Sequence, residues 1–181
     1  VLKININSAS YEIISMGHRN PQGLYFDKQN NFILETEHGP NGGDEINFIE
    51  ENFNYGWPIS SYGNHYDGTF KKEAPLHKSH KEHGFIEPLY YFNPSIGISE
   101  IIKANNISLD KENYYFVASL REMSLFIFRL ENNFNKLTLI DKIEINERIR
   151  DIIYFSNKDI YIMTLENTPS LGIFFRKDKS K

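Results

Sequence analysis

The sequence GLYFDKQNNFILETEHGPNGGDEINFIE occupies residues 23–50 and contains three short runs of alternating apolar and polar residues. Turn-forming residues separate these runs, so the pattern predicts three consecutive antiparallel strands. The same order recurs at residues 106–131 (NISLD, NYYFVASL, SLFIFRLE) and 150–177 (RDIIYFS, KDIYIMTLE, SLGIFFRK). The first turn of each unit, at 27–31, 110–113 and 156–159, carries the polar residues that tight hairpins prefer.

Repeated units of three or four strands, with no sustained helical periodicity, predict an all-β fold and specifically a β-propeller. A stack of sandwich hairpins is the alternative. Residues 86–92 and 134–145 are candidates for a fourth, edge strand. Propellers close with about four to eight blades, so about three blades plus a leading strand (LKININ, 2–7) do not complete a ring. We therefore expect residues 1–181 to form a single partial propeller domain, with a fragment favoured over several assembling copies or completion by a partner.

Residues 51–85 interrupt the first unit without strand alternation and are rich in Gly, Asn, His and Tyr. A connection of this length in a compact domain is usually functional, so we predict a functional loop here. Within it, HKSHKEH places His77, His80 and His83 at intervals of three residues. A zinc site on one turn face is conceivable, although a solvated basic loop is the favoured interpretation.

The composition excludes several classes of protein. The 181 residues carry a formal net charge of −4 and no Cys, with 14 Phe and 11 Tyr. Without a basic patch, a nucleic-acid partner is not expected, and the apolar runs are too short for a membrane span. The absence of Cys excludes disulfides and thiolate metal sites. No signal peptide is visible, and the residues alone leave the compartment undecided.

The predicted strand order brings the polar loops together. In an antiparallel pair, the segment before the first strand and the segment after the second lie at the same end. Six segments should therefore converge on one rim, where loops on a rigid scaffold commonly carry function. They are GHRNPQG (17–23), HGPNGGD (38–44), FNPSIG (92–97), REM (121–123), NERIR (146–150) and ENTP (166–169).

The rim carries four guanidinium groups, from Arg19, Arg121, Arg148 and Arg150, in a chain of negative net charge. Such a group suits a multiply charged anion, because the planar guanidinium binds carboxylates or phosphates with two hydrogen bonds. Asn20 and Gln22 add neutral donors and acceptors. The alternative is local pairing, for example of Arg148 with Glu147 and of Arg150 with Asp151.

The glycine-rich loop HGPNGGDE (38–45) could fold back so that its carbonyl groups point inward. Carbonyl and carboxylate oxygens are the ligands that Ca²⁺ prefers, while a simple glycine turn is the alternative. Glu35 and Glu37 share one strand face because side chains alternate with a period of two. Two carboxylates alone do not specify glycoside hydrolysis, and no general base can be assigned from these residues.

Several motifs occur together in one order: GHRNPQGLYFD, ETEHGPNGGDEINFIEENFNYGWP, YDG, NPSIG, ASLR and ERIRDI. In this combination, from about Tyr11 to Arg176, the chain resembles the soluble quinoprotein aldose (glucose/sorbosone) dehydrogenases, specifically their C-terminal half. That resemblance implies a six-bladed propeller, the cofactor pyrroloquinoline quinone (PQQ) and calcium. It also implies an aldose substrate, a missing N-terminal half as partner, and a periplasmic or secreted location, with a homo-oligomer possible.

Carried over residue by residue, the resemblance implies a cofactor site. Arg19 looks like the catalytic Arg that contacts the quinone carbonyls. Arg148 and Arg150 match a pair that clamps the PQQ carboxylates, and Arg121 matches a basic position that meets one of them. The other positions that resemble cofactor-lining residues are Asn20, Gln22, Tyr66 and Ser95.

The same resemblance implies two calcium sites and a reaction. Gly39 and Pro40 look like the pair whose carbonyls hold the cofactor's Ca²⁺, and Glu45 and Tyr55 match a second, structural calcium site. The implied reaction is oxidation of the sugar C1 hydroxyl to the lactone, with a His as general base. That His lies upstream of the matching region in the family, so we expect the isolated chain to be inactive. A non-catalytic propeller segment or a carbohydrate- or anion-binding module is the alternative.

Overall fold

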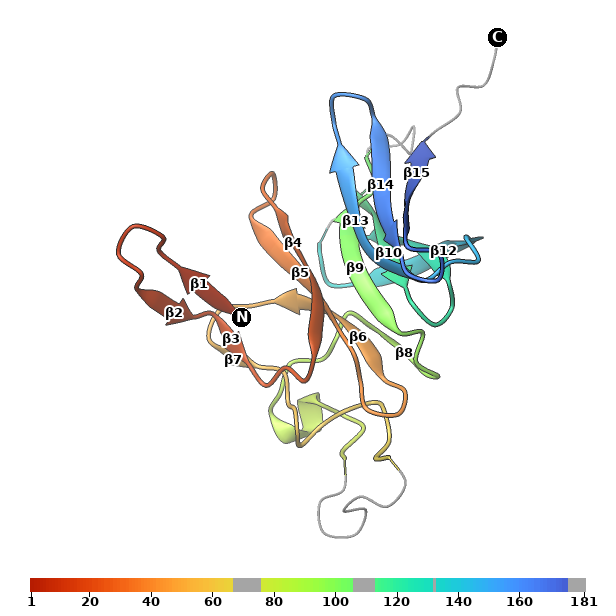
Figure 1. The fold of residues 1–181 in the computed structure, drawn as a ribbon. Coiled ribbons are helices and arrows are strands. Elements are labelled where there is room, and N and C mark those ends of the chain that lie inside the picture. Colours follow the sequence, from red (N-terminus) through yellow and green to blue (C-terminus); the bar gives the residue numbers. More distant parts are fainter. Residues whose placement is uncertain (67–75, 106–112, 132, 176–181) are drawn as a thin grey trace.

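The computed structural model describes residues 1–66, 76–105, 113–131 and 133–175, and its fold is all-β (Figure 1). The first sheet contains β4 (Pro21–Asp27), β5 (Phe32–Glu37), β6 (Asp44–Ile49) and β8 (Tyr90–Phe92). The second contains β9 (Ile98–Lys103), β10 (Asn113–Ser119), β11 (Ser124–Leu130) and β12 (Leu137–Glu144). The third contains β13 (Ile149–Phe155), β14 (Ile160–Leu165) and β15 (Ser170–Phe175). The smaller elements are the hairpin β1 (Leu2–Ile4) and β2 (Tyr11–Ile13), the parallel pair β3 (Ser15–Met16) and β7 (Phe53–Asn54), and a 3₁₀ turn (Lys81–His83).

The three sheets are successive propeller blades, because their first strands lie side by side along one axis (Figure 1). Strand β9 packs between β4 and β13. Two buried hydroxyl groups connect the blades. The Thr36 hydroxyl donates to the Ser99 carbonyl oxygen (2.5 Å), and the Ser99 hydroxyl donates to the Ile149 carbonyl oxygen (2.6 Å).

The middle blade is packed on both faces. Along β10, Tyr115 and Val117 contact the first blade, while Phe116 and Ala118 contact the third. Successive residues of a strand point to opposite faces, so a continuous apolar run gives two buried faces. The central residues 115–118 are therefore apolar on both faces, because neither face meets solvent there.

The predicted repeat is confirmed for the first and third units, and the edge strands β8 and β12 confirm the two candidate segments. The prediction for the first strand of the second unit was wrong. It is β9, whereas the predicted NISLD (106–110) lies outside the described residues. The segment ISEIIK lacks simple alternation because it packs between two blades and its pairing with β10 shifts register between Val117 and Ser119.

The predicted leading strand is one arm of a hairpin. Only Leu2–Ile4 of LKININ is a strand, and it pairs with Tyr11–Ile13. This hairpin extends away from the blades (Figure 1). Among the described residues, no helix is long and apolar enough to cross a membrane.

Candidate functional site

The loops before the first strand and after the second meet in each blade. Each contact is a main-chain hydrogen bond from an N–H group to a carbonyl oxygen. His38 donates to Asn20 (3.1 Å) in the first blade, and Arg121 donates to Ile96 (3.0 Å) in the second. Glu166 donates to Arg148 (3.0 Å) in the third. The first and third blades also come together here, since Arg150 Nη1 lies 3.5 Å from Gln22 Oε1. The convergence that strand order predicted is therefore confirmed.

Arg148 and Arg150 share one carboxylate. Their Nε atoms donate to the two oxygens of Glu166 at 3.1 and 2.5 Å. These hydrogen bonds lower the pKa of Glu166. Both arginines therefore pair with an acid, as the alternative held, but the named partners Glu147 and Asp151 were wrong. Glu166 follows β14, which pairs with β13, so it lies beside both arginines. Two guanidinium groups thus face one carboxylate at this point of the rim.

Arg19 is more enclosed than the other rim arginines. Its Nη1 donates to the His38 carbonyl oxygen (3.0 Å), and its guanidinium lies over the Trp57 ring, 5.2 Å from the centroid. Its Nε is buried and has no hydrogen-bond partner. The adjoining main-chain N–H groups of Arg19 and Asn20 donate to Glu37 Oε2 at 2.5 and 3.3 Å. A buried carboxylate thus fixes this wall of the rim from below.

Four other residues predicted to bind the cofactor lie at two positions on the rim, one in the first blade and one at the start of the second. The Gln22 amide donates to the Asn20 side-chain oxygen (3.1 Å), beside Arg150. Arg121 Nη1 donates to the Ser95 carbonyl oxygen (3.2 Å) on the neighbouring blade. The Ser95 hydroxyl itself donates inward to Asp44 (2.7 Å), so it supports the rim from below.

Asp44 organises both the cation loop (38–45) and the start of the second blade, a role that sequence reasoning missed. Its Oδ1 accepts from the Gly39 N–H (3.2 Å), and its Oδ2 accepts from the N–H groups of Ile96 (3.1 Å) and Ile98 (3.0 Å). Burial raises the pKa of Asp44, but hydrogen bonds from His38, Ser95 and the Ile98 N–H outweigh this effect, so the net shift is downward. The signal available in the sequence was an Asp at the first position of a strand.

The cation loop folds tightly on itself. A Cβ on Gly39 would lie 2.1 Å from the Gly42 carbonyl oxygen, and a Cβ on Gly43, whose φ is +69°, would lie 2.1 Å from the Gly63 nitrogen. Both positions therefore require glycine. Residues 63 and 64 lie against this turn, because Asn41 and Asn64 exchange main-chain hydrogen bonds of 3.0 Å.

Glu45 and Tyr55 adjoin a narrow hollow of about 10 Å³ beneath the cation loop, which Gly39 and His80 also line. Burial and the charge of Glu37 raise the pKa of Glu45 well above its ordinary value. The Tyr55 hydroxyl donates to the Phe48 carbonyl oxygen (2.5 Å) and accepts from the Glu50 N–H (2.9 Å). Because the hydroxyl already has these two partners, Tyr55 would bind a cation through its main-chain carbonyl oxygen.

The alternative interpretation of His77, His80 and His83 as one zinc site was wrong. His80 is buried between Glu45 and Glu87, 3.6 Å from an oxygen of each. The rings of His77 and His83 contact each other instead, with centroids 3.8 Å apart. In the part of the chain that the structure describes, only His18, Glu35 and Glu37 bring three such metal-binding side chains within 4.8 Å.

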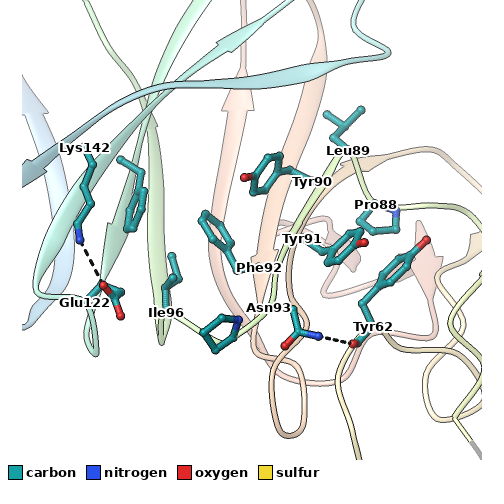
Figure 2. Close-up of a pocket in the computed structure, with 12 residues that line it drawn as sticks. Tyr62, Pro88, Leu89, Tyr90, Tyr91, Phe92, Asn93, Ile96, Glu122 and Lys142 are labelled. Carbon is teal, nitrogen blue, oxygen red and sulfur yellow. Dashed lines mark hydrogen bonds and ion pairs between the residues drawn. The ribbon is translucent and has the colours of Figure 1, made fainter.

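A larger hollow, of about 640 Å³, lies between the outer strands of the first two blades (Figure 2). Tyr62 and Tyr91 stack at its edge with centroids 3.7 Å apart. On the other side, Lys142 pairs with Glu122 (3.2 Å). None of the rim residues predicted to bind cofactor or metal lines this groove, so the groove is distinct from the predicted cofactor site.

Comparisons with known proteins identify the family. The glucose/sorbosone dehydrogenase family matches residues 3–172. The aldose sugar dehydrogenase YliI of Escherichia coli is 32% identical over 171 residues, 93% of this chain and 45% of that protein. The quinoprotein glucose dehydrogenase B of Acinetobacter calcoaceticus is 50% identical over 54 residues, 30% of this chain and 11% of that protein.

A solved structure agrees with this assignment. The apo form of the soluble aldose sugar dehydrogenase from Escherichia coli superposes with a TM-score of 0.74 at 27% identity, covering 91% of this chain and 47% of that chain. The chain thus spans less than half the length of the curated and solved relatives named here. Because the family match covers most of its residues, the chain belongs to the glucose/sorbosone dehydrogenase family.

Proposed function

We propose that the chain forms the cofactor-binding half of a PQQ- and calcium-dependent aldose dehydrogenase that oxidises sugars at C1 to the lactone. The observation that carries the proposal is the pair Arg148 and Arg150 sharing the single carboxylate of Glu166. The carboxylates of a tricarboxylate such as PQQ would pair with these two guanidinium groups.

The residues present fit the cofactor. Arg19 Nε is buried without a hydrogen-bond partner, and a bound quinone would offer it acceptor oxygens. Arg150 lies near Gln22, so groups from two blades face the same side of the rim. PQQ would supply the ortho-quinone that accepts the hydride from the sugar. Arg148, Arg150 and Arg121 would bind carboxylates, while Asn20, Gln22 and Tyr66 would line the cofactor.

Arg19 is the catalytic candidate of this chain. Its guanidinium is held by the His38 carbonyl and the Trp57 ring, so its charge is oriented before any ligand binds. A preorganised positive charge stabilises negative charge that develops during reaction. His18 and His38 do not match the general base, because His18 is buried against Glu35 and Glu37 and His38 contacts Asp44.

The calcium proposal rests on oxygen donors around the cation loop. The carbonyl groups of Gly39 and Pro40 would hold the cofactor's Ca²⁺. The carboxylate of Glu45 and the carbonyl of Tyr55 would hold a second ion, and both residues line a hollow with room for about one water-sized atom. A buried carboxylate such as Glu45 costs free energy unless it is protonated or meets a cation.

The test separates binding from turnover. The chain is titrated with PQQ in the presence and absence of Ca²⁺, and binding is followed by thermal shift. We expect saturable, calcium-dependent stabilisation that Arg19→Gln and Arg150→Gln each weaken. We expect little dye reduction with aldoses, since the general base would come from the other half of the protein. Absence of PQQ binding by a folded chain would refute the proposal.

An alternative role is carbohydrate binding without catalysis. The aromatic groove at Tyr62 and Tyr91 favours it, because flat ring surfaces with polar neighbours suit sugar rings (Figure 2). Aldose binding that Tyr91→Ala removes and PQQ does not affect would support this role. A periplasmic or secreted location and a homo-oligomer remain proposals from family membership.

A further inference from the structure

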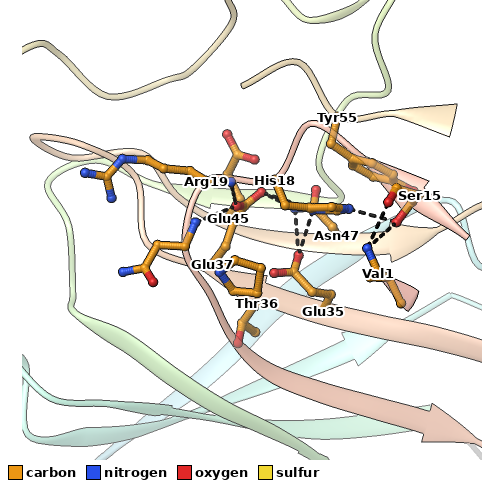
Figure 3. Close-up of polar contacts among 12 residues, drawn as sticks. Val1, Ser15, His18, Arg19, Glu35, Thr36, Glu37, Glu45, Asn47 and Tyr55 are labelled. Atoms are coloured by element: carbon orange, nitrogen blue, oxygen red, sulfur yellow. Dashed lines mark hydrogen bonds and ion pairs between the residues drawn. The ribbon is translucent and has the colours of Figure 1, made fainter. Parts of the chain in front are cut away.

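A second group of buried ionisable side chains lies beneath Arg19 (Figure 3). It adjoins the hollow under the loop 38–45, because Glu37 also lines that hollow. His18 Nδ1 lies 3.5 Å from Glu37 Oε1 and 3.8 Å from Glu35 Oε2. The Asn47 amide nitrogen contacts the same two oxygens at 3.2 and 3.1 Å. Strand pairing explains the gathering, because Asn47 on β6 lies opposite Glu35 on β5.

The group lacks a balancing charge. The side chains of His18, Glu35 and Glu37 are only 6%, 0% and 5% exposed. His18 Nδ1 and Glu35 Oε1 are buried with no hydrogen-bond partner, and so is Asn47 Oδ1. Buried charges in proteins are paired or bind metals, because removing them from water is costly. Burial and the charge of Glu37 raise the pKa of Glu35 well above its ordinary value. The group is therefore stabilised either by protonation of Glu35 or by a cation between the imidazole and the two carboxylates.

The distances suit a small cation. A tetrahedral zinc ion with bonds of about 2.0–2.1 Å has ligand atoms roughly 3.3–3.4 Å apart. The four separations above, from 3.1 to 3.8 Å, lie around that value. If the Asn47 amide turns by half a rotation, Oδ1 takes the place of Nδ2 and becomes a fourth donor.

We propose that His18 Nδ1, Glu35, Glu37 and Asn47 bind one divalent transition-metal ion of the zinc type. Imidazole nitrogen favours such an ion over Ca²⁺, which prefers oxygen alone. The outer contacts also fit. His18 Nε2 lies 2.8 Å from the Ser15 hydroxyl, and the ring stacks on Tyr55 with centroids 4.6 Å apart, so its orientation is fixed.

The ion would act on the rim through Glu37. One oxygen of Glu37 faces His18, while the other accepts from the N–H groups of Arg19 and Asn20. An ion bound to one oxygen of Glu37 would fix the orientation of its carboxylate and therefore also the main chain at Arg19 and Asn20. The binding site itself does not depend on the proposed dehydrogenase function.

The test measures metal stoichiometry and affinity with the full chain. The adjoining imidazoles of His77 and His83 could also bind zinc, so the experiment uses a His77→Asn/His83→Asn background. Metal-free protein is titrated with Zn²⁺ by calorimetry, and Co²⁺ replacement reports tetrahedral coordination by its visible absorption. We expect one ion per chain, and a Kd at least about a hundredfold weaker in Glu35→Gln, since even outer-shell losses cost 10–100-fold.

Glu35→Gln keeps the shape of the side chain and removes a buried charge, so the variant should fold, and its circular dichroism verifies this. His18→Gln supplies a second ligand removal with the same expected loss. Glu144→Gln, at an exposed glutamate of β12, is the matched control and should retain the ion. Failure of the background variant to bind Zn²⁺, or unchanged binding in folded Glu35→Gln and His18→Gln, would overturn the proposal.

Discussion

The hydroxyl group of Tyr66 donates a hydrogen bond to the main-chain carbonyl oxygen of Pro40, at 2.7 Å. The bond joins the loop 51–85 to the cation loop, two segments that the sequence analysis assigned to the same site. It leaves the Tyr66 ring 54% exposed beside the rim. The hydroxyl is thus anchored, while the ring remains available to a ligand.

This arrangement predicts different effects for two substitutions at Tyr66. Tyr66→Phe removes one partly exposed hydrogen bond, so we expect about 1 kcal/mol or less of lost stability and less than about a threefold loss of PQQ affinity. Tyr66→Ala also removes the ring, and we expect about tenfold weaker binding, since aromatic contacts contribute roughly 0.5–1.5 kcal/mol. PQQ titration of both variants provides the measurement. Equal losses in the two variants would mean that the ring does not approach the cofactor.

A second prediction concerns Asp44. Asp44→Asn places a donor amide among the N–H groups of Gly39, Ile96 and Ile98, so one or more buried donors lose their acceptor. We expect a loss of about 2–4 kcal/mol in the free energy of unfolding, measured by urea denaturation. The exposed Asp141→Asn is the control and should change stability by less than about 0.5 kcal/mol. An unchanged free energy of unfolding in Asp44→Asn would show that the loop 38–45 does not depend on the charge of Asp44.

Strand order predicts which loops meet at the rim, but it does not predict how the blades pack against each other. Antiparallel connectivity fixes which loops share an end of a blade, so the meeting of Arg148 with Glu166 follows from strand order even though the pairing itself was not foreseen. Packing between blades is not encoded in a single strand's alternation. For that reason β9 was misplaced. Glu35 and Glu37 were predicted to share one strand face, but the approach of His18 was not, because the path of the chain before β4 does not follow from strand alternation.

The rim arginines give a third prediction. Glu166→Gln removes the carboxylate that competes with an anionic ligand for Arg148 and Arg150. We expect PQQ to bind several-fold more tightly at low salt, while Arg150→Gln weakens binding about tenfold. Stability should change by less than about 1 kcal/mol, because the ion pairs are partly exposed. Lys136→Gln, at an exposed pair with Glu131, is the control. Weaker binding in Glu166→Gln would instead make Glu166 a residue that orients the arginines.

The last prediction is a pH dependence that arises between the first two blades. Asp27 Oδ2 accepts from Lys103 Nζ (2.9 Å) and from the Tyr115 hydroxyl (3.0 Å). Burial raises the pKa of Asp27, but hydrogen bonds from Lys103, Asn30 and Tyr115 outweigh it and lower the pKa below the ordinary value of 3.8. The ionised form is thus favoured in the folded state.

A depressed folded-state pKa stabilises the protein above the unfolded-state pKa, about 3.9, and that contribution disappears as the pH falls through the folded-state value. Asp27→Asn should therefore lower the free energy of unfolding by about 1–3 kcal/mol between pH 5 and 8. The difference from the wild type should shrink below about pH 4. Urea denaturation of both proteins across this range provides the measurement. A difference that stays constant down to pH 3 would show that Asp27 contributes through shape and neutral hydrogen bonds, without a contribution from its charge.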